Sequence, residues 1–437
     1  MRDILLTLFL LGSLPVMLIS PFYGILIYSW ISLFSPHRLT YSFAHDFPFA
    51  LLSAVATLVA WLVSREQKKP VMNAVVWLII LLGLWTSLTE VTALYPETGW
   101  DKWNVAEKGL LMTLVLAALT NTERRLELMT WVSALSIAFY GVKGGVFAIR
   151  TGGQFTIGGP DMTQLADNNQ LALGICMTLP LLLHLFRFAK RSWVRLMLLG
   201  TILLNVLAVV ASYSRGGLLT LGIGTMALLW RSRYRWIIGG LAGLAMLVAV
   251  PFIPQQLQNR YSTIENYEQD NSANLRFEWW KMALRIAQDR PFVGGGFNVF
   301  NDERVYPRYH PNADHPRDVH SIYFEVLGEH GFVGLGIFLT LIVVSFLTCG
   351  AVARRAKGHP ELERSADLAR MLQVSIVCYA VGGALLTLAT FIVFYQVLGL
   401  IVAVDGFVRN TISPPVRRMI GPQAAQQAQR PAPMPAE

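Results

Sequence analysis

Long apolar stretches separated by short polar segments dominate this chain. A membrane-spanning helix needs about 20 predominantly apolar residues, and windows of this kind recur along the whole sequence. The clearest are Phe49–Val63, Val71–Leu88, Val105–Leu119, Leu128–Ile149, Gln170–Phe186, Leu196–Ser212, Gly216–Trp230, Trp236–Ile253, Phe332–Val352 and Met371–Val404. The last window is long enough for two helices. The pattern predicts an all-α, polytopic membrane protein with about 12 transmembrane helices.

The first apolar stretch, Ile4–Phe34, is also long, and Pro15 and Pro21 interrupt it. The pattern leaves open whether it forms one bent helix or two helices. No small-residue cleavage site follows it, so we expect it to remain as an anchor in the membrane.

Basic residues gather in alternate loops between the apolar stretches. They are Arg65, Lys68 and Lys69; Arg124 and Arg125; Arg187, Lys190, Arg191 and Arg195; Arg231, Arg233 and Arg235; and Arg354, Arg355 and Lys357. Thr89–Trp103 and Arg150–Asp167 are poor in Lys and Arg, so the positive-inside rule places them outside the cytoplasm, together with the long loop Pro254–Val319. One loop can conflict with this assignment of membrane sides. If Ile4–Phe34 forms two helices that begin in the cytoplasm, the loop at Arg65 falls on the wrong side.

Composition agrees with a membrane protein, since 54% of the residues are hydrophobic and 14% are charged, against about 25% charged in average soluble domains. The net charge of +9 comes from these loops, so it does not indicate a nucleic-acid partner. Cys176, Cys349 and Cys378 lie within or at the ends of apolar stretches and make no disulfide framework or metal-binding spacing.

These features predict four regions. Residues 1–195 form an N-terminal transmembrane region, and residues 196–347 form a core that includes the loop at 254–319. Residues 348–408 form C-terminal transmembrane helices. Residues 409–437 are rich in Pro, Gln and Ala, from which we expect a disordered cytoplasmic tail.

The long polar loop carries helix signals of its own. Ser272 can cap a helix that ends near Arg290, because Pro291 stops it. Three glycines at 294–296 then allow a tight turn. We expect this helix to lie over the outer end of the bundle as a periplasmic lid.

A second helix is predicted from near His320 to Glu329. The segment Gly328–Gly331 should break it before the next membrane span, and the small residues Gly328, Gly331, Gly334 and Gly336 should let neighbouring helices pack closely. Elsewhere, Asp167, Asn168 and Asn169 are typical of a cap for the helix that starts near Gln170.

Arg215 is the first candidate for chemistry, because it lies where one apolar stretch turns back into the next. The start of a helix is the positive end of its dipole, so an arginine there is favourable only beside an anion. Backbone N–H groups and a guanidinium together suit a phosphate, with Ser214 and Gly216 in support. The alternative is an arginine that snorkels from a tight turn. A charge near the membrane interior costs roughly 2.5–3.5 kcal/mol on insertion scales, which favours the functional role.

Arg276 shares one face of the loop helix with Trp280, Ala283 and Ala287. Alone it is typical of a solvated arginine, and the aromatic face beside it favours contact with lipid headgroups or sugars.

His320 is a candidate general base, because an imidazole with a pKa near 6.5 accepts a proton at neutral pH. Asp318 or Glu325 could orient it, and Tyr323 is a further supporting candidate. The alternative is a histidine that makes a capping contact. A second alternative, a metal site, involves His310, Asp314, His315 and Asp318 with His320. Their spacing matches no helical zinc motif, so we predict no metal site and no cofactor.

These residues resemble the marks of a known family. His320-Ser321-Ile322-Tyr323-Phe324-Glu325, followed by Gly328, Gly331 and Gly334, resembles the C-terminal signature of the O-antigen ligase and polymerase superfamily. Ser214-Arg215-Gly216 and the Arg276 helix ending at Pro291 resemble its other motifs. The shared region is about Leu196–Leu347. Ser35–Thr40 and Asp46–Ala50 resemble the branch of exosortase-associated O-glycosylation ligases.

The resemblance implies a glycan ligase of the bacterial inner membrane with its active site on the periplasmic face. Its partners would be a polyprenyl-diphosphate-linked glycan donor, a lipid or protein acceptor, and membrane lipids. Arg215 and Arg276 would bind the diphosphate, and His320 would activate the acceptor hydroxyl, without a metal and with inversion.

Three alternatives remain open. A glycan polymerase of the same superfamily would use a second lipid-linked glycan as acceptor. A flippase or transporter would need polar groups through the middle of the membrane, whereas the unusual charges here gather at the outer face. A metal-dependent glycosyltransferase would need an acidic pair in an early outer loop, where Asp46 stands alone.

Overall fold

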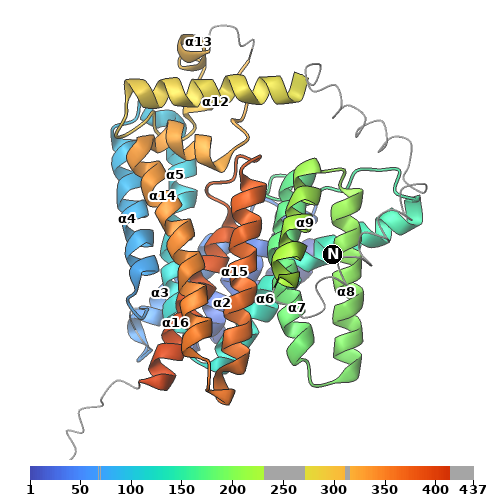
Figure 1. The fold of residues 1–437 in the computed structure, drawn as a ribbon. Helices are drawn as coiled ribbons and strands as arrows, with labels where there is room; N and C mark the ends of the chain where they lie inside the picture. The colour runs from blue at the N-terminus through green and yellow to red at the C-terminus, as the bar shows by residue number, and fades with distance from the viewer. Residues whose placement is uncertain (67, 69, 231–270, 311–314, 414–437) are drawn as a thin grey trace, which may run out of the picture.

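The computed structural model describes the chain except residues 67, 69, 231–270, 311–314 and 414–437, with residues 271–275 described by their backbone alone. Every regular element in that part of the chain is a helix (Figure 1), which confirms the all-α class there. The α-helices are α1 Arg2–Ile19, α2 Pro21–Phe34, α3 Phe49–Val63, α4 Ala74–Val91, α5 Pro96–Leu119, α6 Glu123–Thr151, α7 Asn168–Phe188, α8 Ser192–Ala211, α9 Arg215–Leu229, α12 Asn271–Asp289, α13 Tyr306–Tyr309, α14 Ile322–Arg355, α15 Glu363–Gly383 and α16 Ile392–Ile412. Short 3₁₀ helices are η1 Pro36–Leu39, η4 Val299–Asn301 and η5 Pro360–Leu362.

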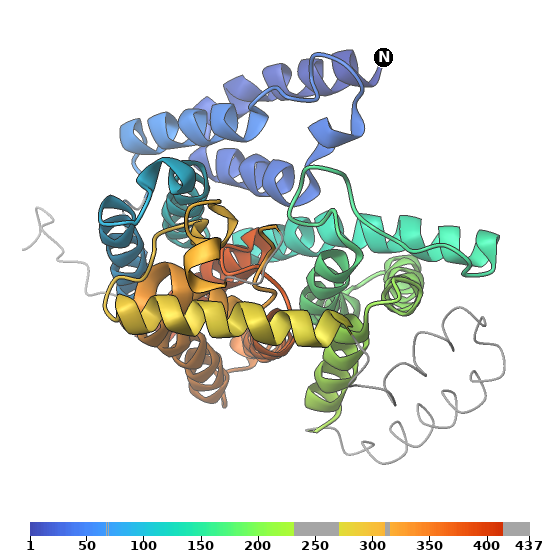
Figure 2. The same cartoon turned by 90° about the horizontal axis from the view of Figure 1, so that it is seen from above.

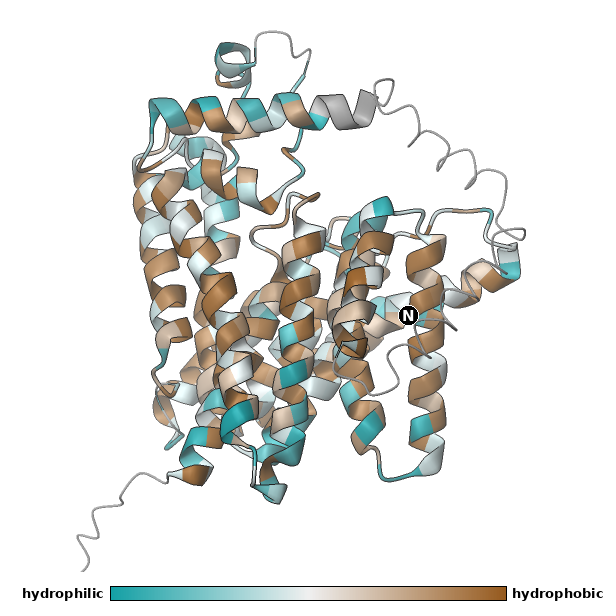
Figure 3. Ribbon diagram, viewed as in Figure 1, coloured by the Kyte–Doolittle hydropathy of each residue, from teal (hydrophilic) through white to brown (hydrophobic). Residues whose placement is uncertain are grey.

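Seven of the described helices are long and apolar enough to cross a membrane, namely α1, α4, α6, α7, α8, α14 and α16. Helices α2, α3 and α9 are apolar but shorter. Apolar residues cover the long helices over most of their length, and polar residues gather toward the ends (Figure 3). The chain is therefore a multi-pass membrane protein. The total of about 12 spans stays a prediction, and its window Trp236–Ile253 lies outside the described residues.

Two of the long apolar stretches each form a pair of helices. Met371–Val404 divides into α15 and α16, as predicted. Ile4–Phe34 breaks at Ser20 into α1 and α2, because the pyrrolidine of Pro21 stands at the first position of α2. The Asp3 carboxylate, at the start of α1, accepts hydrogen bonds from the backbone N–H of Ser42 (2.9 Å), just beyond the end of α2. The two helices therefore run in opposite directions.

This pair also resolves the conflict over sidedness. Arg38, which follows α2, contacts the Met162 sulfur at 3.6 Å, so the start of α1 lies at the end of the bundle that carries the 160s loop. Arg125 pairs with Glu66 at 2.5 Å, so the basic loop after α3 lies beside the basic loop before α6. The loop at Arg65 is thus on the basic side, as the charge pattern requires.

Helix α12 lies across one end of the bundle rather than alongside the other helices (Figures 1 and 2). Its Trp279, Met282 and Ile286 are buried with Val299 and Val319 in an apolar cluster beneath it. The helix ends at Asp289, two residues before Pro291, in agreement with the predicted stop. Its first turn includes Ser272, whose side chain lies outside the described residues, so the predicted cap is untested.

Helix α14 is broken where the glycines predict it, because Gly331 has φ 70° and ψ −173°. The first half of α14 therefore takes its own direction, and the second half crosses the bundle. At the break, the N–H of Phe332 donates to the Pro291 carbonyl at 2.8 Å, which ties the end of the α12 segment to α14. Gly294 (φ 63°) and Gly296 (φ 90°) form the predicted turn.

The prediction of close packing holds for Gly328 and Gly334 and is wrong for Gly336. A Cβ at Gly328 would lie 2.3 Å from the Phe300 ring, whereas one at Gly336 would meet no atom within 4 Å. The helix spacing pattern cannot distinguish these two positions, because Gly336 faces away from its neighbours.

We predict that Gly331→Ala strongly destabilises the protein. Essentially only glycine adopts this backbone conformation, which costs other residues about 1–3 kcal/mol, and the new Cβ would lie 2.4 Å from the Phe292 carbonyl oxygen. The midpoint of thermal unfolding in detergent, followed by tryptophan fluorescence, should fall. Gly336→Ala is the matched control on the same helix and should leave the midpoint unchanged or slightly higher. Equal losses for both variants would contradict the role of the break.

Candidate functional site

The turn between α8 and α9 places Arg215 at the first position of α9, and its side chain is exposed. Ser214 is the N-cap, and its hydroxyl oxygen accepts the N–H of Gly217 at 2.9 Å. Tyr213 has a left-handed backbone (φ 57°), which sharpens the turn. Tyr213 and Ser214 thus shape the turn that presents Arg215, and Gly216, the second residue of α9, has room for a Cβ.

The start of α7 lies against this turn. Asp167 caps α7 in a capping box with Gln170, which confirms the predicted cap. The neighbouring Asn168 donates its side-chain N–H to the Ser212 carbonyl at 2.6 Å. The start of α7 therefore fixes the position of the turn that carries Arg215.

Helix α12 brings Arg276 toward His320 through Trp280, one turn further along. The Trp280 indole N–H donates to the carbonyl of Val319 at 2.9 Å, and its ring stacks on Phe324 with the planes 9° apart and the centroids 4.9 Å apart. Val319 immediately precedes His320. Trp280 therefore joins the Arg276 helix to residues that precede and follow His320 in the sequence.

His320 lies two residues before α14 and is half-buried. Its backbone is left-handed (φ 50°), which is uncommon for a residue with a side chain. Its N–H donates to the hydroxyl oxygen of Thr387 at 2.8 Å. Thr387 lies in the loop between α15 and α16, which the apolar pattern did not identify as part of a site.

Burial lowers the pKa of His320 below 6.5, and nearby charges modify it. The carboxylates of Asp318 and Asp167 raise this pKa, whereas the guanidinium groups of Arg276 and Arg317 lower it. The imidazole is therefore neutral at pH 7 and has a lone pair for a proton. Arg276 on α12 and Asp167 at the start of α7 are thus among the groups that influence the charge of this imidazole.

Glu325 has different partners from those considered in the sequence. One carboxylate oxygen accepts from the Lys102 ammonium at 2.7 Å, and the other accepts from the N–H of Ala389 at 2.8 Å. Both oxygens are thus occupied away from His320, and the acids that influence the imidazole are Asp318, which is exposed, and Asp167. The Tyr323 hydroxyl donates to the Ala380 carbonyl at 2.7 Å and anchors α14 to α15.

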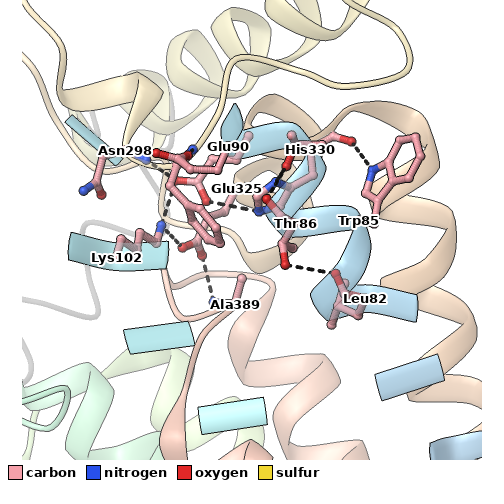
Figure 4. Close-up of polar contacts among 12 residues, drawn as sticks. Leu82, Trp85, Thr86, Glu90, Lys102, Asn298, Glu325, His330 and Ala389 are labelled. Carbon is pink, nitrogen blue, oxygen red and sulfur yellow. Dashed lines mark hydrogen bonds and ion pairs between the residues drawn. The ribbon is translucent and has the colours of Figure 1, made fainter. Parts of the chain in front are cut away.

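Lys102 is the centre of a buried ionic cluster that the sequence did not reveal. Its ammonium lies 2.7 Å from Glu325 and 2.7 Å from Glu329, whose side chains are 1% and 2% exposed. Figure 4 shows Lys102 of α5 facing Glu325 of α14, with Ala389 on the far side of the carboxylate. Two helices and the loop between α15 and α16, from distant parts of the sequence, therefore meet at this cluster.

The cluster extends to the turn that follows α12. The backbone N–H groups of Phe297 and Asn298 donate to Glu90 (3.0 Å) and Glu329 (2.9 Å). His330 contributes a ring nitrogen 2.7 Å from the Thr89 hydroxyl. These contacts, drawn in Figure 4, fasten the turn at 294–298 to α4 and α14.

The residues considered for a metal site do not converge in the part of the chain that is described. His310 is buried with its ring against Trp279, at 5.1 Å between centroids. His315 accepts a hydrogen bond from Arg317 at 2.8 Å, and Asp314 lies outside the described residues. Among described residues, no three His, Cys, Asp or Glu side chains form a metal-binding group.

Comparison with known protein families matches the part of the chain that carries the candidate site residues. Residues 200–339 match the O-Antigen ligase family, and residues 1–190 match a family of unknown function (DUF5935). No curated protein matches the chain. The first match supports the O-antigen ligase superfamily and a glycan ligase- or polymerase-type activity in general. The matched region includes Arg215, Arg276 and His320.

We predict that Lys102→Met destabilises the protein by about 3–5 kcal/mol, because the substitution leaves two buried carboxylates without their cation. Guanidinium or urea unfolding in detergent measures the loss. Lys108→Met is the matched control, since Lys108 is exposed on the same helix, and its effect should stay within about 0.5 kcal/mol. Wild-type stability for Lys102→Met would show that the ion cluster contributes little.

Proposed function

We propose that this protein is a glycan ligase that transfers a saccharide from a polyprenyl diphosphate to an acceptor hydroxyl on the periplasmic side of the bacterial inner membrane. The observation that carries the proposal is that, at one end of the bundle, Trp280 links the Arg276 helix to the residue before His320, while the α15–α16 loop contacts His320 and lies beside Gly216 in the Arg215 turn. That end is opposite the basic loop at Arg355, because His320 and Arg355 flank the two ends of α14. By the charge rule, the His320 end faces away from the cytoplasm.

In this proposal, Arg215 and Arg276 bind the diphosphate. The start of α9 adds backbone N–H groups and the positive end of a helix dipole. Guanidinium groups bind phosphate oxygens with two parallel hydrogen bonds. They would neutralise the charge that develops on the leaving diphosphate, which is the main requirement for breaking the anomeric C–O bond.

His320 then acts as the general base. Its neutral imidazole takes the proton of the acceptor hydroxyl as that oxygen attacks the anomeric carbon and the diphosphate leaves from the opposite face. A single displacement of this kind inverts the anomeric configuration and needs no other co-reactant. Holding donor and acceptor in one site contributes through orientation. Helix α12 would act as the lid over that site.

We expect His320→Ala and Arg215→Ala to reduce transfer by about 10²-fold or more, as removal of a catalytic base or a charge-stabilising donor typically does. Purified variants in liposomes would be assayed with a polyprenyl-diphosphate-linked glycan and candidate lipid and peptide acceptors. Arg308→Ala is the control, because Arg308 is a surface arginine on α13 paired with Asp289.

The same assay separates the alternatives. One glycan per acceptor molecule supports the ligase, and a ladder of products on the lipid carrier would indicate the polymerase. Glycan movement into sealed vesicles without transfer would indicate a transporter. Near-normal transfer by His320→Ala would remove the base assignment.

The pH dependence of transfer should follow the protonation of the His320 imidazole. Since burial lowers its pKa, activity should be retained below pH 6.5 and should fall as the pH drops through the lowered pKa. Asp318→Asn removes a carboxylate that raises this pKa, so the acid limb of the profile should move to still lower pH. An acid limb that moves upward in this variant would contradict the assignment.

A further inference from the structure

The backbone of His320 needs a partner to hold it. A residue with a side chain seldom adopts φ 50°, and such conformations persist where the surroundings fix them. Ser321, which follows, is extended (φ −163°), and α14 begins only at Ile322. His320 is therefore not held by helical hydrogen bonds, and the direction of its imidazole depends on contacts outside α14.

Thr387 supplies such a contact. Its hydroxyl oxygen accepts the His320 N–H at 2.8 Å, across 67 residues of sequence. A hydrogen bond is directional, so this contact restricts the orientation of the His320 N–H. It connects the candidate base to a loop that belongs to a different helix pair.

The loop that carries Thr387 is itself rigidly held. Ala389 donates its N–H to the buried carboxylate of Glu325, which is paired with Lys102. The Tyr379 hydroxyl donates to the Leu388 carbonyl at 3.0 Å. These contacts fix the residues on the C-terminal side of Thr387.

A glutamine from the α6–α7 segment completes the support. The side-chain N–H of Gln164 donates to the Thr390 carbonyl at 3.0 Å, and its carbonyl oxygen accepts the N–H of Ile392 at 2.9 Å. On the other side of the loop, a Cβ at Gly216 would be in ordinary contact with Leu385 at 3.5 Å. The loop therefore touches the turn of Arg215 as well as His320.

We propose that Thr387 is a positioning residue, which sets the place of the His320 imidazole relative to the diphosphate-binding turn through its hydrogen bond to the His320 backbone. This inference rests on the proposed function of His320. A misplacement of about 1 Å between reacting groups can cost on the order of 10²-fold in rate. Loss of the contact should therefore lower kcat, while the KM for the donor, which depends on the arginines, should change little.

Thr387→Val tests the proposal, because valine keeps the branched shape and removes the acceptor oxygen. We expect kcat for transfer to fall about tenfold or more, with a donor KM within about twofold of wild type and a wild-type unfolding midpoint. Thr387→Ser keeps the oxygen and should restore most of the rate. Thr390→Val is the matched control in the same loop, because the Gln164 contact uses the Thr390 carbonyl, and it should leave kcat unchanged.

The outcomes distinguish the two proposals. Inactive His320→Ala with wild-type kcat for Thr387→Val would overturn the positioning role and leave the proposed function intact. An active His320→Ala would overturn the function of the base itself. Equal losses for valine and serine at position 387 would also overturn the proposal, because the hydroxyl oxygen would then not be responsible.

Discussion

The arrangement at the end of the bundle that α12 covers depends on the burial of one ammonium between two carboxylates. Lys102 lies 2.7 Å from both Glu325 and Glu329. Removing these charges from water is costly, and close pairing with additional hydrogen bonds is required to offset it. The extra bonds come from the N–H groups of Ala389 and Asn298. The ion cluster therefore also fixes the two backbone segments that carry those groups.

Each of those segments leads to the candidate site. Ala389 lies in the loop whose Thr387 contacts His320, and Asn298 lies in the turn that follows α12. Helix α12 in turn reaches His320 through Trp280. The buried ionic cluster and the candidate site are thus connected through a few backbone hydrogen bonds. This connection explains how a helix across the end of the bundle can hold a defined position.

Local sequence signals predicted the features that depend on local physics. Pro291 marks the end of α12, Asp167 caps α7, and Gly331 breaks α14, because each acts through its own backbone or through neighbours within one turn. The apolar windows located the helices for the same reason. The pairing of Glu325 was not predictable, since its partner Lys102 on α5 is 223 residues away in the sequence. Thr387 was hidden inside an apolar stretch, and its role depends on how two helix pairs meet.

The sequence distance between Lys102 and its partners also has a consequence for how the protein is made. Helix α5 is synthesised long before α14, which supplies both carboxylates. Until α14 arrives, the ammonium lacks the two carboxylates that contact it in the folded protein, and its flexible stem would favour the aqueous boundary. We therefore expect helix α5 to take its final depth only late in biogenesis, after Glu325 and Glu329 at the start of α14 have left the ribosome.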